Sequence, residues 1–223
     1  NGNSVIVTEN DYVIKLYRIL AKNTLYINSP KDGTTKKPRF TPKSYRLYNV
    51  PVGGQLVPNA KISTANTAAD YTTGNITIAN VESHYQLFSN ESTFTFYYPE
   101  NLQTTTSTIT GWKYRETNSY ASGSKTFTNA PDKSAYIEIQ GDYIDSNNKI
   151  TANATYTVHL GHFSKSLSDF NVIRNNHYIY TVNINGVDDI VAESKIKDAE
   201  NNDVDNPYAE GFVIKAGSGQ HFG

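Results

Sequence analysis

The chain has 223 residues, a formal net charge of −1, no cysteine and no methionine. The balanced charge provides no electrostatic footprint for nucleic acid or for an anionic membrane, and the missing cysteine excludes disulfides, thiolate metal sites and thiol chemistry. Asparagine (25), threonine (24), serine (18) and tyrosine (17) are abundant, against a single tryptophan. Because threonine and tyrosine favour strands while asparagine and serine favour turns, this composition predicts an exported all-β protein.

Apolar side chains at every second position predict strands with one buried face and one solvated face. In chain order, such runs lie at 11–20, 44–52, 74–81, 92–101, 135–144, 154–161, 177–186 and 210–217. The side chains expected to point inward are Phe94, Phe96, Tyr98, Ile137, Ile139, Tyr156, Val158, Leu160, Tyr178, Tyr180, Val182 and Ile184. The turn signal at 145–149 predicts a hairpin between residues 135–144 and 150–160.

The stretch 101–131 is polar and lacks a clear period. It therefore predicts either a long loop or the join between two domains, and we place a boundary near residue 102. The expected domains are an N-terminal β-sandwich over 1–102, lacking its first strands, and a C-terminal β-sandwich over 103–223 with an extended C-terminal segment. The acidic, polar residues 195–207 are predicted to form a mobile linker.

The segment DFNVIRNNHYIYTVNINGV (169–187) collects the residue types of an active site. Asp169 and Asn171 are, however, typical of a turn or cap before a strand. Residues 174–176 are expected to tie that turn to backbone carbonyls, and the alternating run at 177–186 supplies a core face. The segment is therefore interpreted as a structural clamp followed by a central strand.

No catalytic residue, metal ligand or cofactor is expected. His159, His162 and His177 do not converge at a spacing typical of zinc ligands, and we interpret them as surface residues. The sequence AGSGQHFG (216–223) lacks the strand–turn–helix context of a nucleophile elbow. The acidic stretch 198–206 lacks the glycine and the final glutamate of a calcium-binding loop.

Two further segments are candidates for contact with a partner. Trp112, Tyr114 and Tyr120 lie in the polar stretch and are predicted either to stack on a sugar ring or to plug a seam between domains. At the C-terminal end, Phe212, Val213, Ile214 and Ala216 follow the predicted linker. This segment is a candidate donor strand, with Phe212 and Ile214 facing a groove of a neighbouring subunit.

Five blocks of the sequence, in order, resemble a known family. They are YVIKLYRILAK (12–22), SYRLYNVP (44–51), FTFYYPENLQ (94–103), APDKSAYIEIQGDY with ATYTVHLGHF (130–143 and 154–163), and FNVIRNNHYIYTVNINGVDDIVAE (170–193). Together they are similar to the fimbrillins, the subunits of the type V pili of gut and oral Bacteroides-type bacteria, including their accessory or tip-type fimbrial proteins.

The resemblance implies two transthyretin-like, antiparallel β-sandwich domains. It implies export as a lipoprotein precursor to the outer membrane, proteolytic removal of an N-terminal strand, and a place in a cell-surface fimbrium. The expected function is non-enzymatic: a structural or adhesive subunit that joins other pilus subunits by exchange of β-strands. The alternative is a carbohydrate-binding module or tip adhesin that recognises a glycan or protein on a host or bacterial surface. Neither nucleic acid nor a direct membrane span is expected.

Overall fold

The computed structural model describes residues 13–16, 18–29, 39–51, 73–78, 86–88, 91–103, 105–121, 123–144, 147, 149–186, 190–197, 201, 203 and 212–215. Its elements are β1 (Val13–Leu16), β2 (Leu20–Asn28), β3 (Arg39–Pro51), β4 (Thr73–Ile78), β5 (Gln86–Phe88), β6 (Glu91–Pro99), α1 (Trp112–Arg115), β7 (Asn118–Ala121), β8 (Ser124–Phe127), β9 (Tyr136–Ile144), β10 (Ile150–His159), β11 (His177–Ile184), β12 (Ile190–Lys197) and β13 (Phe212–Lys215). Helix in this part of the chain is confined to the short α1, which cannot reach across a bilayer.

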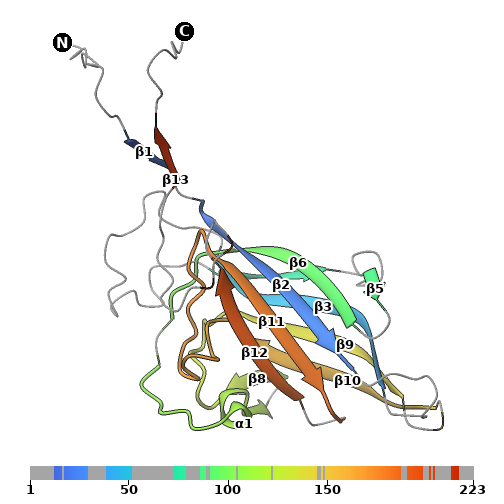
Figure 1. Ribbon diagram of the computed structural model, residues 1–223. Coiled ribbons are helices and arrows are strands. Elements are labelled where there is room, and N and C mark those ends of the chain that lie inside the picture. Colours follow the sequence, from blue (N-terminus) through green and yellow to red (C-terminus); the bar gives the residue numbers. More distant parts are fainter. Residues whose placement is uncertain are drawn as a thin grey trace, which may run out of the picture.

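Two sheets form a sandwich (Figure 1). One has four strands in the order β10–β9–β3–β4, and the other has five in the order β12–β11–β2–β6–β5. All strand pairs are antiparallel except β11 with β2, which is parallel. Two further pairs, β1–β13 and β7–β8, lie outside these sheets. The expected all-β class is therefore confirmed for the described residues.

The core lies between the two sheets and follows the predicted alternation. Along β11, every second residue is buried, and Tyr178, Tyr180, Val182 and Ile184 are at most 1% exposed. The inward residues predicted on β6, β9 and β10 are buried as well. Aromatic side chains join the layers: the rings of Tyr45 on β3 and Phe94 on β6 lie 4.3 Å apart. Period-two patterning thus identified the buried faces because each of these strands covers the core with one face only.

The expected division near residue 102 does not describe this arrangement. Strand β3 pairs with β9, and β2 pairs with β11, so strands from both sides of that residue share both sheets. One core cluster includes Leu25 and Phe94 together with Ile137 and Tyr180. In the described residues, the segments 1–102 and 103–223 therefore contribute to one sandwich. The boundary was predicted from the polar stretch 101–131. Such a local stretch does not indicate which distant strands pair with each other.

The strand positions were predicted unevenly. The hairpin of β9 and β10 is confirmed, with Ile144 opposite Ile150. The single strand expected at 11–20 is wrong, because β1 ends at Leu16 and β2 begins at Leu20. Strand β12 was missed, and its last residues fall in the predicted linker. The stretch 101–131 contains α1, β7 and β8.

Candidate functional site

The stretch 169–187 forms the predicted clamp. The Asp169 carboxylate accepts the backbone N–H two residues later at 2.8 Å, as expected of a cap. Arg174 is 1% exposed, and its Nε and Nη2 lie 3.0 and 3.1 Å from the two carboxylate oxygens of Glu100. The Asn176 side-chain amide donates to two backbone carbonyls in the same turn. Glu100, the ionic partner of this turn, was missed because it lies far away in the sequence.

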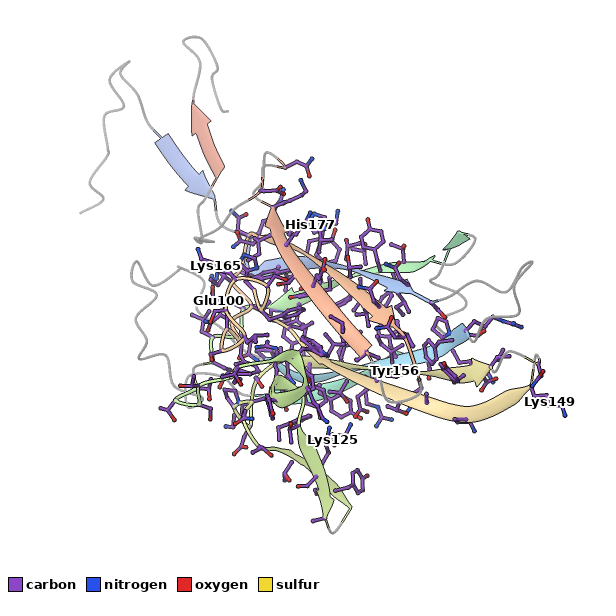
Figure 2. The ribbon with its side chains drawn as sticks, turned by 60° about the horizontal axis from the view of Figure 1, so that its bottom comes forward. Glu100, Lys125, Lys149, Tyr156, Lys165 and His177 are labelled. Atoms are coloured by element: carbon purple, nitrogen blue, oxygen red, sulfur yellow. The ribbon has the colours of Figure 1, made fainter. Side chains whose placement is uncertain are left out.

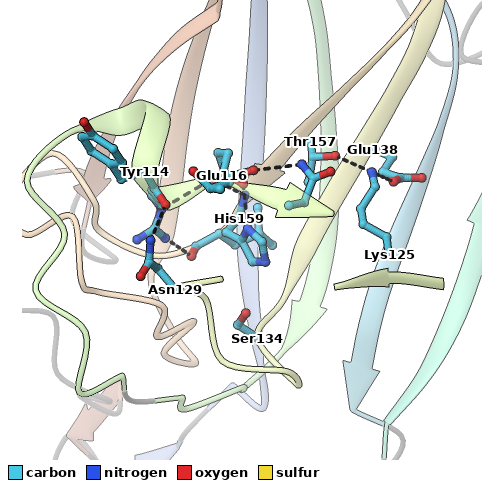
Figure 3. A network of polar contacts seen from close by, with 12 residues as sticks. Tyr114, Glu116, Lys125, Asn129, Ser134, Glu138, Thr157 and His159 are labelled. Carbon is cyan, nitrogen blue, oxygen red and sulfur yellow. Dashed lines mark hydrogen bonds and ion pairs between the residues drawn. The ribbon is translucent and has the colours of Figure 1, made fainter. Parts of the chain in front are cut away.

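Residues 111–130, here called the flap, close over one end of the outer face of β10 and β9 (Figure 3). Arg115 is fully buried and donates to the backbone carbonyls of Leu160, at 2.9 Å, and Leu167. Its guanidinium lies 3.8 Å from the ring centroid of Phe170. Burial lowers the pKa of Arg115 to about 10, so the group remains charged at neutral pH. Arg115 therefore anchors the flap to the loop that follows β10.

A second anchor joins Glu116 to His159. Nδ1 of His159 lies 2.7 Å from one Glu116 carboxylate oxygen, and the His159 backbone N–H donates to the other at 3.0 Å (Figure 3). Aromatic rings of Phe127, Tyr136 and Phe170 surround the imidazole at centroid distances of 4.4 to 5.6 Å. A Glu–His pair in catalysis would present its free nitrogen to a hydroxyl, a thiol or a substrate. Here that nitrogen, Nε2, is buried among rings, so the pair is a structural anchor.

The hairpin of β7 and β8 supplies the third anchor. Lys125 on β8 contacts the Glu138 carboxylate and lies 3.0 Å from the Thr157 hydroxyl. Tyr48 donates its phenolic hydrogen to the same carboxylate at 2.7 Å. Glu138 points outward from β9 as the sequence predicted, but it is only 8% exposed because the hairpin covers it. Charge pairing therefore holds the flap on this face of the sandwich.

The three predicted contact aromatics have different environments. Trp112 is half-buried, packs against the core and lies 4.9 Å from the ring of Phe163. Tyr114 is 56% exposed and Tyr120 is 73% exposed, on α1 and β7 respectively. Trp112 thus contributes to packing, whereas Tyr114 and Tyr120 present exposed rings.

Trp112→Ala is expected to lower the free energy of unfolding by about 2 kcal/mol, because it removes a large side chain from the core edge. Tyr120→Ala removes an exposed ring and should change the stability by less than about 0.5 kcal/mol. Urea denaturation followed by circular dichroism measures both values. Equal stabilities of the two variants would contradict a packing role for Trp112.

The histidines occupy separate environments. His159 and His162 are 0% and 7% exposed, so their interpretation as surface residues is wrong. His162 lies beside the Ser194 hydroxyl at 3.3 Å, and His177 is half-buried on the outer face of β11. The described residues contain no group of three or more histidines and acids that could hold a metal ion. The burial was missed because the covering elements, the flap and β12, lie elsewhere in the sequence.

The candidate donor segment lies in β13. This strand pairs only with β1, in a two-stranded ribbon that stands beyond one end of the sandwich (Figure 1). Leu16 pairs with Phe212, Lys15 with Val213, and Ile14 with Ile214. Ala216 lies outside the described residues. A two-stranded ribbon alone is marginally stable in water.

The sandwich has a short edge strand beside β6. Strand β5 pairs with residues 91–93, three of the nine residues of β6. Tyr97, farther along β6, is 62% exposed. Edge backbone groups of this kind can accept an additional strand.

Comparison with known proteins gives limited matches. A family model described as "Domain of unknown function (DUF4906)" matches residues 96–182, which is less than half of the chain. No curated protein sequence matches the chain.

Two solved structures match the chain weakly. The tip fimbrial protein Mfa3 from Porphyromonas gingivalis, truncated at its C-terminus, is 17% identical with a TM-score of 0.41, covering 82% of this chain and 52% of that protein. A candidate cell adhesion protein from Bacteroides uniformis is 12% identical with a TM-score of 0.33, covering 82% and 51%. This chain covers about half the length of each. Because both TM-scores are below 0.5, this likeness by itself supports no mechanism.

Proposed function

We propose that the chain is a non-enzymatic structural or adhesive subunit of a bacterial surface fimbria, joined to other pilus subunits by exchange of a β-strand. Export as a lipoprotein to the outer membrane belongs to the same proposal. The observation that carries it is the position of β13, an apolar C-terminal strand that pairs with β1 alone and belongs to neither sheet of the sandwich.

The energetic reason is the difference between a ribbon and a sheet edge. In the ribbon, β13 has a partner on one side only. At the edge of a neighbouring sandwich it would form ladder hydrogen bonds of about 1 kcal/mol each and bury apolar side chains worth about 1.5–3 kcal/mol each. Ordering the segment opposes this gain by about 1–2 kcal/mol per residue. The joint is therefore expected to persist mainly because strand release is slow.

The acceptor in this proposal is the edge of β6 beyond its short pairing with β5. Its inner face already carries Phe96 and Tyr98, which are 5% and 0% exposed. A strand added beside β6 would extend the five-stranded sheet and continue its apolar inner face. The polar anchors of the flap lie elsewhere, on the outer face of the four-stranded sheet, so this addition leaves them in place.

Deletion of residues 208–223 is expected to abolish incorporation into fimbriae while leaving the sandwich folded. The deletion removes β13 but none of the core residues. The measurement is the amount of chain in the sheared fimbrial fraction of a producing Bacteroides-type cell, relative to the amount on the cell surface. Circular dichroism of the purified deleted chain checks its folding. Normal incorporation of the deleted chain would contradict strand exchange through β13.

A reversible lock provides the matched control. The chain lacks cysteine, so within one chain, cysteines introduced at the paired positions 14 and 214 can form a disulfide only with each other. The oxidised Ile14→Cys/Ile214→Cys variant is expected to stay out of fimbriae, and reduction should restore entry. The single Ile14→Cys variant should enter normally. Entry of the oxidised variant at the normal level would show that β13 does not need to leave β1.

A further inference from the structure

Four side chains form a row across the outer face of the five-stranded sheet. Strand pairing places Tyr97 of β6 opposite Lys22 of β2, Lys22 opposite His177 of β11, and His177 opposite Lys197 of β12. Paired residues on neighbouring strands point to the same side of a sheet, and the adjacent residues Tyr98 and Tyr178 are buried on the inner side. We call Tyr97, Lys22, His177 and Lys197 the basic row.

Polar contacts on the same outer face hold His177 in place. The Thr24 hydroxyl lies 2.9 Å from His177 Nε2 and 3.0 Å from the Thr95 hydroxyl. This contact fixes the imidazole and leaves Nδ1 with no partner among the described residues. At the end of the row, Lys197 lies 3.3 Å from the Asp203 carboxylate, and Asp203 is itself largely exposed.

The lysines on the two outer faces of the sandwich differ in their ion pairs. On the four-stranded sheet, Lys43 lies 2.6 Å from Asp142, and Lys125 contacts Glu138. On the five-stranded sheet, Lys197 pairs with Asp203, whereas the described residues provide no carboxylate within ion-pair distance of Lys22 or Lys195. Figure 2 shows His177 and Lys125 on opposite sides of the sandwich.

The positive charge of Lys22 in the basic row therefore favours an anionic ligand. Glu193, an exposed residue of β12, is the acidic group on the same outer face of that strand, against Lys195 and Lys197. Neighbouring strands lie about 4.8 Å apart, so the row extends over roughly 14 Å and can contact several units of an extended chain molecule.

We propose that the basic row binds an anionic polysaccharide laid across the strands, with its acidic groups at Lys22 and His177 and a sugar ring on Tyr97. Tyr97 decides between a sugar and an acidic peptide: its ring is 62% exposed at one end of the row and offers a flat apolar face with a polar tip. The inference uses neither β13 nor the β1 ribbon, but it shares β6 with the proposed assembly, because Tyr97 lies on the strand whose edge is the acceptor.

The pH dependence of binding follows from the surroundings of His177. Burial, and then the charges of Lys22 on β2 and Lys197 on β12, lower the pKa of His177 below its ordinary value of 6.5. Without ligand, the imidazole is therefore neutral at pH 7. A bound acidic group favours the charged imidazolium, so binding should raise this pKa and affinity should increase as pH falls below the ordinary value of 6.5 toward the lowered pKa of the free protein. Proton NMR of the His177 ring, with and without polysaccharide, measures the shift.

Binding of the purified chain to four immobilised polymers tests the proposal: polygalacturonate, heparin, neutral dextran and poly-L-glutamate. The first two separate carboxylate from sulfate as the preferred group. Lys22→Gln is expected to weaken binding about two- to fivefold at low salt, and Tyr97→Thr about three- to tenfold. The matched control Lys113→Gln changes an exposed residue of the flap and should bind as the unmodified chain does.

Three results would overturn the inference. They are failure to bind either acidic polysaccharide more tightly than dextran, equal binding by Lys22→Gln and its Lys113→Gln control, and equal binding of poly-L-glutamate with no effect of Tyr97→Thr. The last result would assign the row to an acidic peptide instead. Thermal unfolding of each variant confirms that a loss of binding does not reflect a loss of fold.

Discussion

Replacement of Glu100 by alanine is expected to lower the free energy of unfolding by about 3–5 kcal/mol. Arg174 is 1% exposed, and both oxygens of the Glu100 carboxylate lie within 3.1 Å of its guanidinium nitrogens. Removing this carboxylate leaves the arginine charge buried without its counter-charge. The guanidinium loses its contacts with Glu100 in a buried site, so the cost falls on the folded state. Urea denaturation at neutral pH measures the change.

Two variants make this prediction specific. Lys43→Ala breaks the pair with Asp142, in which Lys43 is 54% exposed, and should cost less than about 1 kcal/mol. The double variant Glu100→Ala/Arg174→Met removes both charges and should recover at least about 1 kcal/mol relative to Glu100→Ala, because apolar replacement of a buried pair is often tolerated. If Glu100→Ala lowers the free energy of unfolding no more than Lys43→Ala does, the Glu100–Arg174 ion pair contributes little to the stability of the clamp.

Gly161→Ala is expected to lower the free energy of unfolding by about 3–5 kcal/mol, from strained backbone and a steric clash together. Gly161 follows β10 with a φ of +123°, a conformation that residues with a side chain rarely adopt. An added Cβ would lie 2.5 Å from the backbone oxygen of Asp169, so the backbone would have to shift. The Gly161 N–H also donates to the Tyr180 hydroxyl at 3.1 Å, which ties this turn to the core. In thermal unfolding, the midpoint should fall by about 10 °C.

Other glycines separate the two contributions. Gly123 has a φ of +80° with open space around its missing Cβ, so Gly123→Ala should show the backbone term alone, about 1 kcal/mol. Gly111 has an ordinary extended φ, and a Cβ there would meet the Tyr114 ring at 3.6 Å. Gly111→Ala should therefore not destabilise the chain. A Gly161→Ala cost as small as that of Gly123→Ala would rule out the clash.

Much of the sandwich was predictable because side chains alternate between the two faces of a strand, so buried faces show as apolar residues at every second position. The alternation of Phe94, Phe96 and Tyr98, and of Tyr178, Tyr180 and Val182, predicted faces that are buried in the structure. The turn at residue 169 was predictable for the same local reason, because an aspartate caps the backbone two residues away.

Strand β2 shows where local patterns fail. Its central residues Lys22, Asn23 and Thr24 are polar, yet Asn23 and Thr24 are 0% and 6% exposed. Polar residues can be buried there because β2 lies inside its sheet between β11 and β6, and Thr24 finds hydroxyl and imidazole partners on both neighbours. A local sequence pattern cannot predict these partners of Thr24, because they lie about 70 and 150 residues away in the chain.

The sequence by itself determined the all-β class, the inward face of most strands and the caps of the clamp, because these depend on residues within a few positions of one another. Only the tertiary structure decided that one sandwich includes strands from both halves, that Glu116 meets His159, and that three strands bring Lys22, His177 and Lys197 into one row. The physical reason is that pairing between distant strands minimises exposed apolar area and unpaired backbone over the whole chain at once, so neighbours in space need not be neighbours in sequence.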